Sequence, residues 1–136
     1  MNKAMNEQVI RAYFSSIGKT LSNNFLYAYV EPGNLDLALF GAISFIKMKN
    51  FIAAFYSDEI IIAPLTLTSD FDITENPIII REENIDSLKI KKGIIQYVIT
   101  IVTKSGKLKL KCNKKIALYD WQASNLKYLD DNKWLM

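Results

Sequence analysis

The segment from Ser87 to Lys115 reads SLKIKKGIIQYVITIVTKSGKLKLKCNKK, and it carries the clearest strand and turn signals in the chain. β-Branched and aromatic residues dominate IIQYVITIVT (94–103), while polar and apolar residues alternate in KLKLKC (107–112). Lys104–Lys107 lies between them and contains a glycine, which is typical of a hairpin turn. The segment therefore predicts two antiparallel strands joined by a tight turn.

The alternation in KLKLK also predicts which side chains face outward. Successive residues of a strand point to opposite faces of the sheet. We expect Leu108 and Leu110 to face the core, and Lys107, Lys109 and Lys111 to face solvent about 7 Å apart, twice the rise per residue. These three lysines are the centre of a set of nine in 29 positions, 87–115, that contain no acidic residue.

The flanking sequence predicts further strands and a helix at each end. Lys91-Lys92-Gly93 is expected to form a turn, and EPGN (31–34) another. Apolar residues with helical period, from Val9 to Leu21, predict an amphipathic helix in the first 21 residues. We expect it to dock on the protein's own core, with a neighbouring subunit, a partner helix or a membrane surface as alternatives. Strands are expected near residues 36–46, 51–57, 59–66, 78–82 and 86–91.

A C-terminal helix is expected over residues 116–130. Trp121 is its expected anchor in the core. Tyr119 and Leu126 are expected on the opposite side, as an exposed pair or part of an interface. The residues expected on the core face are Ala117, Leu118, Trp121, Asn125, Tyr128 and Leu129.

Length and composition indicate one domain over residues 1–136, mainly β, with about seven antiparallel strands between the two helices. The single Cys112 allows no internal disulfide and is typical of a reducing compartment, where we expect a small buried thiol. No uncharged stretch exceeds 11 residues, and the first residues are too polar for a secretory signal. We therefore expect a cytoplasmic protein, with peripheral membrane association as an alternative.

Catalytic and metal sites are not expected. The chain has no histidine, which removes histidine-based catalysis and metal binding. Asp58-Glu59 and Glu82-Glu83 are adjacent pairs whose side chains point to opposite faces of a strand, so they do not converge as an acid/base couple would. We expect no enzyme activity and no cofactor.

The order of these segments resembles small bacterial pleckstrin-homology-like (PH-like) domains, with the YokE-like group as the nearest relative. The resemblance rests on FIAAFYSDEIIIAPL (51–65), REENIDSLKIKKGIIQYVITIVTKSGKLKLKC (81–112) and ALYDWQASNLKYL (117–129). It places a PH-like core at residues 35–130 and a helical extension at 1–24. It implies a β-barrel or split barrel of two orthogonal antiparallel sheets, capped by the last helix.

Lipid-binding members of the PH family carry basic residues in the first loop between strands and on the strand that follows. Lys47 and Lys49 match the basic character of that loop. The arginine expected on the following strand is absent, because Phe51-Ile52-Ala53-Ala54 occupies it. The resemblance therefore marks Lys47 and Lys49 as candidate ligand-binding residues, beside Lys107, Lys109 and Lys111.

The distribution of charge favours a binding module. Residues 58–86 carry eight acids and one arginine, a balance of −7, whereas residues 87–115 carry +9. Such asymmetry is typical of a polarised surface that meets a partner. We expect a non-catalytic scaffold that binds a protein or a second copy of itself. An anionic membrane surface is the alternative partner, and nucleic acid is less favoured because the chain has only two arginines.

Overall fold

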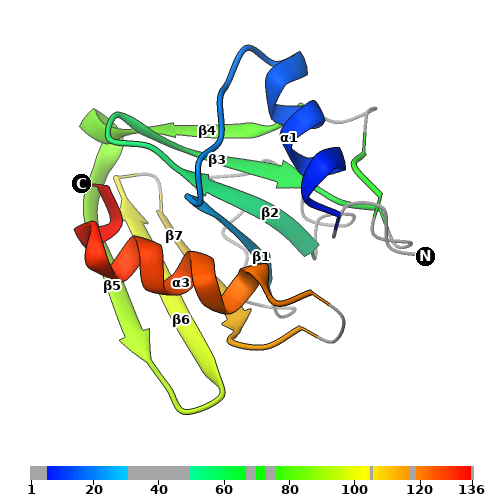
Figure 1. Cartoon of the computed structure of the whole chain (residues 1–136). Helices are drawn as coiled ribbons and strands as arrows, with labels where there is room; N and C mark the ends of the chain where they lie inside the picture. The colour runs from blue at the N-terminus through cyan, green and yellow to red at the C-terminus, as the bar shows by residue number, and fades with distance from the viewer. Residues whose placement is uncertain are drawn as a thin grey trace.

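The computed structural model describes residues 6–30, 50–66, 70–72, 76–104, 106–116 and 119–135 (Figure 1). The strand expected near 36–46, together with Lys47 and Lys49, lies outside these residues. Two helices, α1 (Glu7–Ser16) and α3 (Trp121–Asp131), and two short 3₁₀ helices, η2 (Glu82–Asn84) and η3 (Lys133–Leu135), are described. The described strands are β1 (Phe25–Tyr29), β2 (Asn50–Phe55), β3 (Glu59–Pro64), β4 (Ile78–Arg81), β5 (Ile85–Lys92), β6 (Gln96–Thr103) and β7 (Gly106–Asn113).

These strands form one antiparallel sheet in the order β4-β3-β2-β1-β7-β6-β5. The predicted mainly β class, with a helix at each end, is confirmed. The expected β-barrel or split barrel of two orthogonal sheets is corrected to one sheet that is not closed into a barrel. Within the described residues, the edge strands β4 and β5 are joined through η2 and do not pair with each other. The sheet therefore keeps two edges.

The strand β1 was not among the predicted strands, and the sheet begins ten residues before the expected start of the core at residue 35. The helix expected over the first 21 residues ends at Ser16 instead. Gly18 adopts φ +82°, and the amides of Gly18 and Lys19 donate to the carbonyls of Ser15 and Phe14 at 3.0 and 2.8 Å. This is a Schellman cap, and it releases the chain to become a strand.

The sheet separates two hydrophobic cores, and its two halves are covered differently. The first core lies on the inner face of the sheet. It includes Leu126, Leu129 and Trp134 from the C-terminal region. The second lies on the other face of β2 and β3, where Ile10 and Phe14 of α1 pack. Both faces of β2 and β3 are therefore buried, whereas β6 and β7 alternate and bury one face only.

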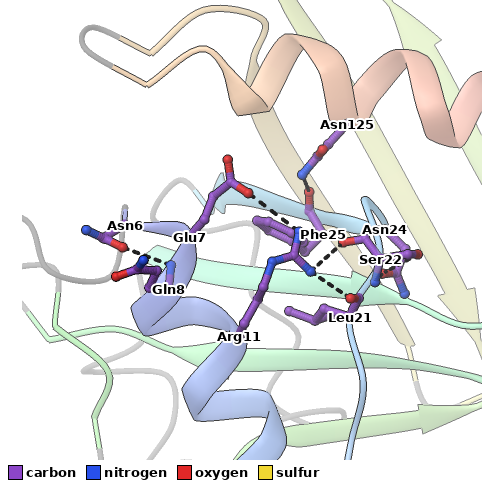
Figure 2. A network of polar contacts seen from close by, with 9 residues as sticks. All are labelled: Asn6, Glu7, Gln8, Arg11, Leu21, Ser22, Asn24, Phe25 and Asn125. Carbon is purple, nitrogen blue, oxygen red and sulfur yellow. Dashed lines mark hydrogen bonds and ion pairs between the residues drawn. The ribbon is translucent and has the colours of Figure 1, made fainter.

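The N-terminal helix is attached by a polar clasp as well as by its apolar face (Figure 2). Arg11 donates to the carbonyls of Leu21 and Ser22 at 2.6 and 3.1 Å, and its guanidinium lies 5.4 Å from the centre of the Phe25 ring. On the other side of Phe25, its carbonyl accepts a hydrogen bond from Asn125 of α3 at 2.9 Å. Both helices thus contact the first residue of β1.

Side chains of α3 complete the hydrogen bonding of β1. Only Tyr29 of this strand is in register with β7, opposite Lys111. At Tyr27, the Gln122 side chain accepts from the amide at 2.9 Å and donates to the carbonyl at 2.8 Å. Gln122 and Asn125 are buried, and their amides occupy the place of an adjacent strand. Because unpaired buried backbone groups are costly, this contact fixes α3 against the sheet.

Leu126 is buried in the first core, so its predicted exposure is wrong. The buried residues of α3 are Trp121, Gln122, Asn125, Leu126 and Leu129. Trp121, Asn125 and Leu129 were predicted on the core face, and this part of the prediction is confirmed. Gln122 was missed because a polar side chain does not enter an apolar periodicity. The helix also begins at Trp121, later than predicted.

We predict that Gln122→Leu lowers the free energy of unfolding by about 2–4 kcal/mol, because it leaves the Tyr27 amide and carbonyl buried without partners. Chemical denaturation with wild type as reference measures this difference. The matched control is Gln96→Leu. Its half-buried side chain bonds Tyr29 and Asn113, and water replaces those bonds, so we expect a loss below about 1 kcal/mol. Equal losses in the two variants would contradict the strand-like role of Gln122.

Candidate binding surface

The outer face of β5, β6 and β7 carries five lysines in two columns. The middle strand presents Val98, Thr100 and Val102, each half-buried, on this face. In the register, Lys91 and Lys111 flank Val98, and Lys89 and Lys109 flank Thr100. In the next row, Lys107 and Ser87 flank Val102. We call the set Lys89, Lys91, Lys107, Lys109 and Lys111 the basic face.

The predicted orientation of the KLKLK segment is confirmed. Leu108 and Leu110 are fully buried, and Lys107 and Lys109 are exposed. Lys111 is half-buried, because it lies in the row that joins β7 to β1 at Tyr29. Strand spacing places the two lysine columns about 10 Å apart, with about 7 Å between lysines of one column. The arrangement presents several cations to one partner at once.

Two lysines of the basic face, Lys89 and Lys91, were not among the predicted site residues. Their strand alternates in the same way as β7, with Ile90 packed against the first core and its two lysine neighbours exposed. The signal was present in the letters KIK (89–91). Both lysines lie in the strand predicted near 86–91, but the alternation of that strand was not used, and Lys91 was also assigned to a turn, whereas the strand continues to Lys92.

The acidic segment divides into a buried carboxylate and an exposed group. Glu59 is buried and forms ion pairs with Lys19 at 2.8 Å and Arg81 at 3.6 Å, which join the segment just after α1 to β3 and β4. Its neighbour Asp58 is exposed in the bend before β3, so the two carboxylates of this pair lie in different surroundings. Glu82 and Glu83, expected on a strand, lie in η2 and are both exposed. The exposed acids Asp58, Glu82, Glu83 and Asp86 gather around η2, where the Glu82 amide donates to the Asp58 carbonyl at 2.9 Å.

The two groups of charge lie at different places along β5. This strand starts beside η2 and the exposed acids and runs toward Lys91 and Lys92. Asp86 is the one acid within β5, β6 and β7, and it lies at the irregularity between Ile85 and Ser87, beside η2. The asymmetry of the sequence is therefore also a separation in space, with an acidic end and a basic face.

A hollow of about 410 Å³ lies between α3 and the far end of β5 and β6. On its wall, Asp130 accepts hydrogen bonds from the Tyr97 hydroxyl at 2.7 Å and the Trp134 indole at 3.0 Å, and it pairs with Lys92 at 3.3 Å. Burial acts to raise the pKa of Asp130, but these three partners outweigh it and hold that pKa below its usual value. Burial and the neighbouring Asp130 raise the pKa of Tyr97 to about 12.

The polar partners of Asp130 satisfy its carboxylate, and this network joins β6, α3 and the C-terminal turn.

Cys112 is fully buried, as predicted, and burial raises the pKa of its thiol. Its lysine neighbours in the sequence therefore do not make it a reactive thiolate. In the described ranges, no group of three or more cysteines or carboxylates is placed to hold a metal ion. No helix among the described residues is long and apolar enough to cross a bilayer.

Comparisons with known proteins give no relative. No family model matches the chain, and neither the curated proteins nor the solved structures contain a match to it.

We predict that Asp130 makes the protein sensitive to acid. A carboxylate whose folded pKa is depressed contributes stability above its unfolded pKa, and that stability is lost as the pH falls through the folded value. Between about pH 5 and pH 2, the free energy of unfolding should therefore fall more in wild type than in Asp130→Asn. Denaturation series across this range measure the two slopes.

The control for this experiment is Asp131→Asn, the same substitution at the next residue. Asp131 is exposed, and it pairs with the exposed Lys127 at 2.9 Å. This variant should keep the wild-type pH slope. A wild-type slope in Asp130→Asn would show that the network does not stabilise the charged carboxylate.

Proposed function

We propose that this chain is a non-catalytic binding module that recognises an acidic protein surface through its basic face. The observation that carries the proposal is the arrangement of five lysines in two columns around Val98, Thr100 and Val102. The helix α1 covers β2 and β3 and does not cover the basic face, which consists of outward lysines on strands. Such a face suits a partner that offers several carboxylates over a similar area.

We further propose a PH-like fold, related to the YokE-like group. Three features support the assignment. The strand order places four strands, β4 to β1, beside three strands, β7 to β5, and the two groups join where Tyr29 of β1 pairs with Lys111 of β7. The chain ends in a helix that packs into the shared core. The N-terminal helix lies outside this arrangement, over β2 and β3.

The basic face favours a protein partner over nucleic acid because its cations are lysines and because it has no aromatic side chains for stacking. Both arginines of the chain are engaged within it: Arg11 bonds the carbonyls before β1, and Arg81 pairs with Glu59. The basic face therefore has lysines only, with no guanidinium for bidentate contact to bases or phosphates. It also has no aromatic stacking platform, because the middle strand presents valine and threonine there.

The chain itself offers one partner of suitable chemistry. The exposed acids around η2, Asp58, Glu82, Glu83 and Asp86, lie on the same molecule as the basic face. Contact between the basic face of one copy and the acidic end of another joins two different surfaces, which is a head-to-tail contact. We therefore infer that the chain self-associates through this electrostatic contact, and that the association weakens with salt.

We predict that Lys89→Glu/Lys107→Glu/Lys109→Glu abolishes association without unfolding the domain, because all three lysines are exposed and none contributes a core contact. Light scattering coupled to size exclusion, at about 50 mM and about 500 mM salt, measures the assembly state. Wild type should associate at low salt and dissociate at high salt. The triple variant should be monomeric at both.

The matched control is Lys104→Glu/Lys127→Glu/Lys133→Glu, which changes the net charge equally at exposed positions outside the basic face. It should associate like wild type. Replacing Asp58, Glu82 and Glu83 with lysine tests the other side of the contact, and mixing that variant with the first one should restore association. If the Lys89/Lys107/Lys109 variant assembles like wild type, the basic face is not the binding surface.

A further inference from the structure

The turn between β5 and β6 presents two adjacent isoleucines to solvent. Ile94 is 92% exposed and Ile95 is 79% exposed, whereas the next large apolar side chain in order of exposure among the described residues, Ile79, is at 46%. Turns of this kind usually carry glycine, asparagine, aspartate or serine. Isolated exposed apolar residues are ordinary, but a neighbouring pair at the tip of a hairpin is not. We call Gly93, Ile94 and Ile95 the isoleucine turn.

The backbone of the isoleucine turn is held in place. The Gly93 amide donates to the Gln96 carbonyl at 2.9 Å, and a Cβ on Gly93 would lie 2.5 Å from that oxygen, so the tight turn needs glycine there. Lys114 bonds both isoleucine carbonyls: its amide donates to Ile95 at 3.0 Å and its Nζ to Ile94 at 3.2 Å. The turn thus offers apolar side chains while both isoleucine carbonyls are satisfied from within the protein.

Cations surround the turn, and the exposed acids near η2 lie away from it. Lys92 precedes the turn, and Lys114 and Lys115 follow β7 beside it. Two acids in the nearby hollow, Asp130 and Asp131, pair with Lys92 and Lys127. The acidic end around η2 lies at the other end of β5, roughly 25 Å away for a strand of this length. Figure 1 shows the β5–β6 turn on the side of the molecule opposite α1.

From these observations we propose that the isoleucine turn inserts into the interfacial region of an anionic lipid bilayer, with Lys92, Lys114 and Lys115 against the headgroups. Unpaired backbone polar groups oppose insertion, and the two Lys114 bonds satisfy the carbonyls of Ile94 and Ile95. A negative surface attracts the end that carries Lys92, Lys114 and Lys115 and repels the acidic end around η2. The molecule therefore approaches the surface with the isoleucine turn foremost. This surface is separate from the basic face, and it does not depend on the proposed protein partner.

A bilayer fits this tip better than a protein does. The turn is convex and offers two apolar side chains, whereas a stable protein contact buries about 800 Å² on each partner. A bilayer needs no complementary pocket. Burial of two isoleucines strengthens binding on the order of a hundredfold, and each lysine near an anionic surface adds about fivefold. Isoleucine burial and lysine attraction act together, and either contribution alone would leave the binding too weak.

The test uses the full chain and sedimentation with two kinds of vesicle, one of phosphatidylcholine alone and one rich in phosphatidylserine. Wild type should bind the phosphatidylserine vesicles and bind the neutral ones far less. Ile94→Ser/Ile95→Ser should weaken that binding on the order of a hundredfold. The matched control is Val9→Ser/Ile79→Ser, which removes partly exposed apolar side chains elsewhere and should bind like wild type. Unchanged binding by the Ile94/Ile95 variant would overturn the proposal.

Insertion itself is read from a tryptophan placed in the turn. Trp121 and Trp134 are buried, so Ile95→Trp adds the one exposed indole among the described residues. Its emission should shift to shorter wavelength on vesicles and be quenched by bromine on the acyl chains, while Ile79→Trp should show neither change. An unquenched indole at position 95 in sedimented protein would mean attraction by charge alone, and the insertion proposal would be wrong.

The same variants separate this proposal from the proposed function. If Ile94→Ser/Ile95→Ser no longer self-associates and wild type binds neither kind of vesicle, the turn is a protein contact and the insertion proposal is wrong. Vesicle binding retained by Lys89→Glu/Lys107→Glu/Lys109→Glu would support insertion even if the basic face proved to bind no protein. Vesicle binding that followed the basic-face lysines and ignored the isoleucines would overturn it.

Discussion

The hydrogen bonds between α3 and the second edge of β1 are the constraint on which the rest of the structure depends. One edge of β1 pairs with β2 along its whole length, but the other meets β7 only at Tyr29. Gln122 and Asn125 bond the backbone of Tyr27 and Phe25 in place of a strand. Because these amides are buried, they cannot exchange their partners for water without a cost. They therefore fix where α3 crosses the sheet, and with it the position of the first core.

The position of the helices determines which surfaces are left for binding. The helix α1 lies on the face of β2 and β3 that points away from the first core, so these strands are apolar on both sides. No such cover is needed on the outer face of β5, β6 and β7, where lysines alternate with buried residues. The candidate binding surfaces thus belong to the half of the sheet that α1 does not cover.

Much of the fold follows from local patterns in the sequence. Alternation in KLKLK predicted the outward lysines, and β-branched runs predicted five more strands to within a few residues. The strand β1 was not predicted because FLYAY comes soon after a helical pattern in the sequence. Gly18, which ends the helix, was overlooked. The buried face of α3 was predicted in part. Trp121, Asn125 and Leu129 are buried as expected, but Gln122 was missed because it is polar and bonds the backbone of a strand 95 residues earlier.

The candidate sites were predicted in part, for a related reason. Lys107 and Lys109 were found from the pattern of one strand, but the two-column arrangement depends on the pairing of β5 with β6, which a single strand does not reveal. Ile94 and Ile95 belong by composition to the strand IIQYVITIVT, and the sequence prediction placed them there. The register instead starts at Gln96, which leaves both isoleucines in the turn.

The distance along the chain between β1 and its partners on α3 also bears on how the protein folds during synthesis. The strands β5, β6 and β7 follow one another directly and pair with their neighbours, so they can form soon after they are made. The bonds to Tyr27 join residues 95 positions apart. Until Gln122 leaves the ribosome, the second edge of β1 lacks its side-chain partners. A nascent or truncated chain that ends before α3 therefore exposes an apolar strand edge to other chains, which is a known route to aggregation.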